Sequence, residues 1–336
     1  MWTQYLGEYV IFLLEAITVV VAVLLIISGI VGAATKGKIK EGGKLTIRPL
    51  HDHFKEMKSL LEKEVYSRTD LKNEMKAEKK IIKHERKKAK KEKTHPKRIY
   101  VINFDGDMRA SQVESLREEV TAILRIAKPS DEIVVKLESG GGVVHGYGLA
   151  ASQLERIRQS HVPLTVVVDK VAASGGYMMA VIADKLIAAP FAIIGSIGVV
   201  AQLPNFNRLL DERGVDVELH TAGAFKRTLT TLGKNTDEGR EKFKEELENV
   251  HGLFKTHIQK FREKLDLEKV ATGEYWFGHD ALQLGLVDEL MTSDDYLLFA
   301  YEKENCELYE VSYKLKKGRF HKLQTSVEKS LYRVGL

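Results

Sequence analysis

The sequence predicts an α/β fold with a mainly parallel sheet covered by helices, preceded by one N-terminal transmembrane helix and a basic helical linker. Three observations predict it. A charge-free apolar run lies near the N-terminus, a strongly basic run follows it, and after Pro96 apolar strand-like runs alternate with helical ones. With 336 residues, 44% of them hydrophobic, the chain can bury a substantial core, which excludes disorder throughout.

The predicted membrane anchor, residues 1–35, contains 19 uncharged residues at 16–34. As a helix rising about 1.5 Å per residue, this run spans roughly the 30 Å hydrocarbon core. A cleaved signal peptide is the alternative, but the preceding residues carry no Lys or Arg, which favours a retained anchor. Lysines at 36, 38 and 40 follow the run, so the positive-inside rule predicts a cytosolic domain, with a periplasmic domain as the alternative.

A basic linker is predicted over residues 36–96. Residues 72–98 hold 13 Lys and Arg against 4 Asp and Glu, a local charge of +9 in a chain of net charge +5. The run lacks interleaved aromatic residues and nucleic-acid-binding motifs, so we expect it to lie near anionic lipid headgroups and expect no nucleic acid partner. Residues 52–93 are rich in Lys, Glu, Leu, Met and Ala, which indicates an extended polar helix.

The predicted catalytic domain spans residues 97–295, followed by a basic C-terminal tail at 296–336. Its expected strands are 98–106, 132–139 and 163–169, and its expected helices are 110–127 and 145–159. Residues 186–207 carry no charge, and a second membrane span is the alternative there. Because glycines and prolines interrupt this stretch, buried strands and turns are the better interpretation.

Ser174 is the candidate nucleophile. It follows an apolar strand in VAASGGY and precedes Gly175 and Gly176, which permit a sharp turn into a helix and leave room for a substrate. A tight packing turn is the alternative. In a parallel sheet the glycines of the ESGGG turn, residues 140–142, would face the same edge as Ser174. Their N–H groups and that of Gly175 could then form an oxyanion hole; a flexible turn is the alternative.

A proton acceptor for Ser174 is harder to find. His145 and His220 have no obvious paired carboxylate, so we expect solvent-facing or structural roles for them. Lys226 lies among small and aromatic residues in TAGAFKR. A lysine amine accepts a proton only when neutral, a form that burial favours, so Lys226 is the better candidate base, although a surface Lys-Arg pair is an equally simple reading.

The motifs VAASGGY, GSIGVV (195–200), TAGAFKR and EYWFGHDALQLGLVDEL (274–290), taken in this order, resemble the signal peptide peptidase A family of serine peptidases over about residues 97–295. The resemblance implies the fold shared by the Clp protease proteolytic subunit and the crotonases, built from repeated β-β-α units. It also implies a serine endopeptidase with a Ser174-Lys226 dyad. The oxyanion hole would comprise Gly141, Gly142 and Gly175.

The same resemblance implies a single-pass protein of the bacterial inner membrane, a peptide or membrane-protein substrate, contact with membrane lipids, a ring-like homo-oligomer, no metal and no cofactor. One residue departs from the family pattern. Relatives commonly have proline where this chain has Gly140, so we expect a less restrained turn and slower turnover. The alternatives are a crotonase-type acyl-CoA enzyme and a catalytically idle membrane scaffold.

Overall fold

The computed structural model describes residues 42–67, 69–70, 96–223 and 225–315, with a few isolated positions elsewhere. Residues Leu45–Lys314 form one compact unit. The anchor expected at 16–34 and most of the linker expected at 36–96 lie outside the described residues. Within the described part of the chain, no helix combines the length and apolarity that a membrane crossing requires.

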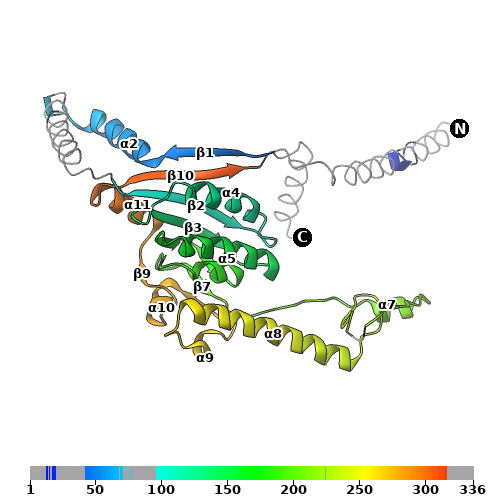
Figure 1. Cartoon of the computed structure of the whole chain (residues 1–336). Coiled ribbons are helices and arrows are strands. Elements are labelled where there is room, and N and C mark those ends of the chain that lie inside the picture. Colours follow the sequence, from blue (N-terminus) through cyan, green and yellow to red (C-terminus); the bar gives the residue numbers. More distant parts are fainter. Residues whose placement is uncertain are drawn as a thin grey trace. The chain divides into compact units, whose positions relative to one another are not determined.

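A mainly parallel sheet organises the unit, as the sequence predicts (Figure 1). Its strand order is β1-β10-β2-β3-β4-β6-β9, and the pairs from β10 to β9 are parallel. These strands are β1 (Lys44–Pro49), β2 (Arg98–Gly106), β3 (Glu132–Ser139), β4 (Leu164–Val168), β6 (Lys185–Ala188), β9 (Glu289–Leu290) and β10 (Glu307–Lys314). The expected strands at 98–106, 132–139 and 163–169 are therefore confirmed to within a residue or so.

A second set of short strands continues the sheet beyond the end of β4. Strand β5 (Val171–Ala173) pairs with the last residue of β3, β7 (Ile193–Gly195) pairs with β5, and β8 (Tyr275–Phe277) closes this branch as an antiparallel edge. The consecutive strand pairs β4-β5 and β6-β7 are the β-β parts of the repeated units that the sequence predicts. Ser174 directly follows β5 in this branch.

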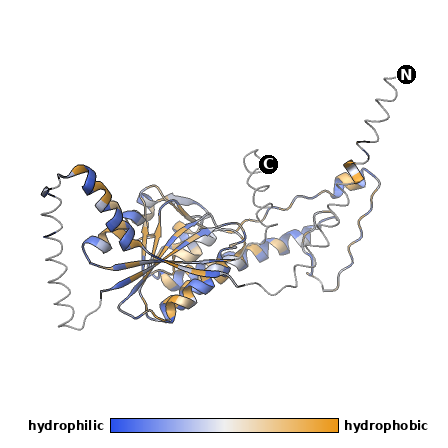
Figure 2. Ribbon diagram, turned by 90° about the horizontal axis from the view of Figure 1, so that it is seen from above, coloured by the Kyte–Doolittle hydropathy of each residue, from blue (hydrophilic) through white to orange (hydrophobic). Residues whose placement is uncertain are grey.

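Helices cover both faces of the sheet because its strands carry apolar side chains on both faces. In β2, Tyr100 and Ile102 point to one face, and Ile99 and Val101 to the other. The first face packs against α4 (Val113–Leu124), α5 (Val144–Gln159), α6 (Gly175–Ala180) and the end of α8 (Asp237–Phe261). The second packs against α2 (Leu50–Val65) and α11 (Ser293–Glu302). Figure 2 shows the hydrophobic residues of the strands gathered between these helices.

Two segments differ from the sequence-based expectation. Residues 186–188 and 192–197 form mostly buried strands and turns as expected, but Phe191 between them is 83% accessible. The apolar residues that follow are also exposed, and the Val200 side chain is 91% accessible. They lead to α7 (Asn207–Asp211). At the other end, α11 and β10 lie in the stretch expected to be a tail and belong to the compact unit, because Leu308 and Val311 of β10 are buried against the sheet. The remaining short helices are α9 (Leu267–Val270) and α10 (Gly278–Gln283).

Candidate active site

Ser174 occupies a strained turn between β5 and α6. Its backbone angles are φ 52° and ψ −118°, in the left-handed half of conformational space that non-glycine residues rarely adopt. Its N–H donates to the Gly195 carbonyl oxygen at 2.8 Å, which holds the turn in place. Its neighbours Ala173 and Gly175 are buried, whereas the Ser174 side chain is half-buried and lines a cavity. This geometry is that of a nucleophile at a sharp strand-to-helix turn.

The glycine turn lies directly against Ser174, as the sequence predicts. Strands β3 and β5 pair in parallel with Ser139 opposite Ala172, so the residues two positions further on, Gly141 and Ser174, meet at one edge. Gly141 has φ +89°, and a Cβ added to it would lie 2.7 Å from the Gly175 nitrogen and 2.8 Å from the Ser174 Cβ. Only glycine fits there, since a side chain would push the two turns apart.

The three predicted oxyanion donors are not equivalent. The Gly141 N–H donates to the Ser139 Oγ at 3.1 Å. Among the described residues, the Gly142 N–H has no hydrogen-bond acceptor. Gly175 is the first residue of α6, so its N–H has no carbonyl four residues earlier within the helix to which it could donate. The N–H groups of Gly142 and Gly175 are therefore available to a bound oxygen, whereas Gly141 shapes the turn.

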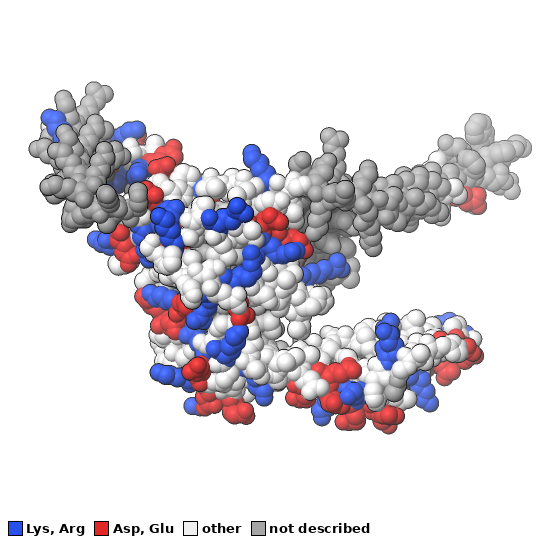
Figure 3. Space-filling view, in the orientation of Figure 1, with Lys and Arg blue, Asp and Glu red and all other residues white. Residues whose placement is uncertain are grey.

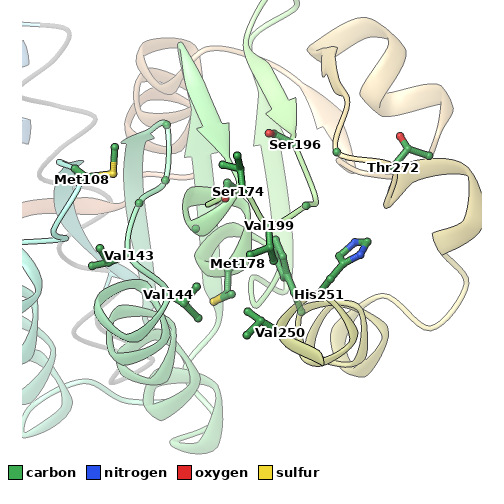
Figure 4. A pocket seen from close by; sticks show the side chains of 18 residues that line it. Met108, Val143, Val144, Ser174, Met178, Ser196, Val199, Val250, His251 and Thr272 are labelled. Atoms are coloured by element: carbon green, nitrogen blue, oxygen red, sulfur yellow. The ribbon is translucent and has the colours of Figure 1, made fainter. Parts of the chain in front are cut away.

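A cavity of about 700 Å³ opens in front of Ser174 (Figure 4). Its walls are largely apolar and come from the glycine turn, α5, α6, the segment after β7, and α8. The apolar side chains are Met108, Val143, Val144, Met178, Val199, Val200, Val250 and Phe254, and the polar ones are Ser174, Ser196, His251 and Thr272. A largely apolar cavity with a few polar groups is typical of a binding site.

Ser196 is the other serine in this cavity and also has a positive φ, 51°. Its N–H donates to the Glu274 carbonyl at 2.7 Å. Unlike Ser174, it precedes no helix: the residues after it, Ile197 to Phe206, have no regular secondary structure. The glycine turn lies against the Ser174 Cβ. Ser174 is therefore the better placed of the two hydroxyls for a reaction that develops an oxyanion.

The structure does not bring Lys226 to Ser174 within one chain. Lys226 is exposed and does not line the cavity. The centre of the neighbouring Phe225 ring lies 5.2 Å from the Nζ of Lys242, which belongs to the N-terminal half of α8. The cavity is lined by α8 from Val250 onward, about 12 Å further along the helix at about 1.5 Å per residue. The burial that would favour a neutral amine is absent in the single chain.

Sequence reasoning missed His251. It lines the cavity from α8, and its buried Nε2 has no hydrogen-bond partner among the described residues. The signal was its position beside Val250 and near Phe254, apolar residues of an otherwise charged helix. His145 and His220 do not line the cavity; both are exposed, and the His220 Nε2 lies 3.1 Å from Glu218, a carboxylate that the sequence had not made obvious.

The strained serine, the two available backbone donors and the apolar cavity together define the class of serine hydrolases. Comparison with known proteins gives the family. The model of peptidase family S49 matches residues 156–307, and that of the S49 N-terminal region matches residues 4–154. The chain belongs to peptidase family S49, the signal peptide peptidase A family of Ser-Lys serine proteases, so the resemblance stated above is confirmed.

Individual relatives cover nearly the whole chain. The "Probable protease SohB" of Haemophilus influenzae is 46% identical over 98% of this chain and 95% of its own length. The "Probable protease SohB" of Buchnera aphidicola subsp. Schlechtendalia chinensis is 46% identical over 88% and 99%, respectively. The solved structures include a lysine-to-alanine mutant of the 1510-N membrane-bound stomatin-specific protease in complex with a substrate peptide. It has 14% sequence identity to this chain and a TM-score of 0.44, and the match covers 70% of this chain and 99% of that one.

Proposed function

We propose that the protein is a membrane-anchored serine endopeptidase that cleaves peptides or membrane-associated proteins. The observation that carries this proposal is the pairing of the strained Ser174 turn with the glycine turn, two residues beyond the point where β3 and β5 pair. The arrangement serves acyl transfer because it presents a nucleophile beside unused backbone N–H groups. The β-β-α units support the proposed Clp protease/crotonase-like fold.

The proposed reaction uses no metal and no cofactor. Neutral Lys226 takes the Ser174 proton as the Ser174 Oγ attacks the scissile carbonyl carbon. The N–H groups of Gly142 and Gly175 stabilise the carbonyl oxygen as it becomes negative. When this tetrahedral intermediate collapses, the carbon–nitrogen bond breaks, and the lysine ammonium returns the proton to the leaving amine. Water then attacks the acyl-enzyme while Lys226 again accepts a proton. The ester bond to the Ser174 Oγ breaks, the lysine ammonium returns the proton to that oxygen, and the carboxyl product leaves.

A neighbouring copy of the chain is proposed to supply Lys226. The segment that carries it exposes apolar side chains to an extent that monomers rarely leave open, namely Val200, Leu203, Phe206, Leu209, Val215, Leu219, Phe225 and Leu232. In Figure 3, the arm formed by α7 and the first half of α8 is largely uncharged along its upper side, and its Asp, Glu, Lys and Arg gather along the lower side. A ring-like homo-oligomer would cover this surface and bury the amine beside Ser174 of the next subunit.

Substrate and membrane location follow from the cavity and the N-terminal sequence. The apolar cavity walls support substrates with small or hydrophobic side chains, bound as an extended chain. We place the anchor at residues 16–34 of a bacterial inner membrane and the domain in the cytosol, because basic residues follow the anchor. Protease treatment of intact spheroplasts tests this: we expect the domain to survive, and its degradation from outside would place it in the periplasm.

Co-expression of two inactive variants tests the mechanism and the assembly together. Ser174→Ala and Lys226→Ala should each abolish peptide hydrolysis in full-length protein that still assembles. In rings with randomly mixed subunits, about a quarter of the sites should join an intact Ser174 to an intact Lys226 from the neighbour. Recovery of about that fraction of activity supports the proposal. Assembled mixed rings without activity would place the base within the same chain, and full activity of Lys226→Ala alone would refute the dyad.

A further inference from the structure

A series of hydrogen bonds anchors the glycine turn, and two of its members, Ser139 and Tyr147, do not line the cavity. The Gly141 N–H donates to the Ser139 Oγ at 3.1 Å, the Ser139 Oγ lies 2.5 Å from the Tyr147 hydroxyl, and the Tyr147 hydroxyl donates to the Asp107 carbonyl oxygen at 2.8 Å. It links the ends of β2 and β3 to α5, and all of its members lie outside the catalytic dyad.

Counting protons fixes the direction of this series. A tyrosine hydroxyl has one proton, and here it is donated to the Asp107 carbonyl. The Ser139 hydroxyl must therefore donate its own proton to the Tyr147 oxygen and accept from the Gly141 N–H. Burial raises the pKa of Tyr147, so the hydroxyl keeps its proton. Ser139 is 2% accessible and Tyr147 is 0% accessible, so a lost partner could not be replaced by bulk water.

The Tyr147 ring also contacts the nucleophile turn. A Cβ added to Gly175 would lie 2.4 Å from the Tyr147 Cγ, which shows that the ring packs directly on the backbone after Ser174. At the other end of the side chain, a Cβ added to Gly106 would lie 2.5 Å from both the Tyr147 hydroxyl and the Ser139 Oγ. One side chain thus touches the nucleophile turn with its ring and holds the glycine turn, through Ser139, with its hydroxyl.

We propose that Tyr147, acting through Ser139, is a positioning residue that fixes the separation between the glycine turn and the Ser174 turn, and with it the convergence of the Gly142 and Gly175 N–H groups. This inference rests on the proposed function and deepens it. The turn is held on its C-terminal side by the Val143 N–H, which donates to the Met108 carbonyl oxygen at 2.9 Å. The hydrogen bond from Gly141 to Ser139 is the restraint on its N-terminal side.

The expected defect is in turnover and not in substrate binding. Oxyanion donors act at about 2.7–3.1 Å, and losing one costs about 10²–10³ in kcat. A turn that is loosened but still present should lose less, so we expect Tyr147→Phe to lower kcat by about 10–100-fold. Tyr147 itself does not line the cavity, so its hydroxyl touches no bound substrate, and KM should change by less than about threefold.

The experiment compares Tyr147→Phe, Ser139→Ala and the double variant with Tyr296→Phe as the matched control. The Tyr296 hydroxyl also donates a hydrogen bond, a partly buried one to Glu132 at 2.5 Å, but it belongs to α11 on the opposite face of the sheet. For each full-length variant, kcat, KM and the rate of inactivation by a fluorophosphonate are measured, since the phosphonyl oxygen must enter the same hole. Urea unfolding measures stability in parallel.

We expect kcat and the inactivation rate to fall together in Tyr147→Phe and in Ser139→Ala. The double variant should have a kcat only slightly below that of either single variant, because both changes interrupt the same series of hydrogen bonds. Tyr296→Phe should lose stability without losing kcat. The inference is overturned if Tyr147→Phe retains wild-type kcat, or if its loss matches that of Tyr296→Phe at equal stability. The proposed function itself fails only on a different result, namely activity in Ser174→Ala.

Discussion

Replacing Ser174 by glycine should abolish hydrolysis and stabilise the domain at the same time. The serine has φ 52° and ψ −118°, the conformation of the first central residue of a type II′ turn, which glycine dominates. A residue held in such a sparsely populated region costs about 1–3 kcal/mol. Glycine relieves this cost but loses about 0.5–1 kcal/mol more conformational freedom on folding, so the net gain should be about 0–2.5 kcal/mol.

Urea unfolding of the wild type, Ser174→Gly and Ser174→Ala provides the assay. Alanine removes the hydroxyl but keeps the Cβ and the strain, so Ser174→Ala should be as inactive as Ser174→Gly without being stabilised. For a domain of this size the glycine variant should gain up to about 10 °C in Tm. A lower stability of Ser174→Gly than of Ser174→Ala would refute the inference that the nucleophile turn is strained.

Three further predictions concern the base, the glycine turn and pH. Lys226→Arg should be as inactive as Lys226→Ala, with kcat lowered about 10³-fold or more, because arginine does not deprotonate; activity in the arginine variant would exclude a proton-accepting role. Gly141→Ala should abolish activity through its clash at 2.7 Å, whereas Gly140→Ala, with open space around it, should keep wild-type kcat; similar kcat in both would contradict the packed turn. Burial raises the pKa of Glu119 to about 7, so the folded domain retains a proton that the unfolded chain releases from about pH 4.5. The free energy of unfolding in urea should therefore fall as the pH rises from about 4.5 to 7, and Glu119→Gln should remove that fall. The same pH dependence of stability in Glu119→Gln as in the wild type would contradict this prediction.

Much of the fold follows from sequence alone, because parallel strands buried on both faces are near-continuous apolar runs. The runs at 98–106 and 132–139 became β2 and β3 with the predicted bounds. The serine and glycine turns were also predicted to meet, since both follow strands of one parallel sheet. The pairing of Ser139 with Ala172 provides the physical reason that they do.

Other features depend on tertiary contacts that no local pattern reveals. The hydrogen bonds among Ser139, Tyr147 and Asp107 join three elements, and nothing in the letters HGYG marks that tyrosine as different from an ordinary core residue. The local setting of Lys226 suggested burial, but its segment is exposed in the structure. Under the proposed function, a neighbouring copy would provide the surface that covers it. The position of His251 at the cavity could not be predicted, because the surrounding helix sequence is strongly charged and typical of a solvent-exposed helix.

The central claim is that Ser174 is the nucleophile, and labelling with a fluorophosphonate probe tests it most directly. The full-length protein in detergent is treated with the probe, digested, and the adduct located by mass spectrometry. Two serines line the cavity, so Ser196→Ala serves as the matched control for Ser174→Ala. We predict one adduct, on Ser174, that persists in Ser196→Ala and disappears in Ser174→Ala. An adduct on Ser196, or labelling that survives in Ser174→Ala, would contradict the account.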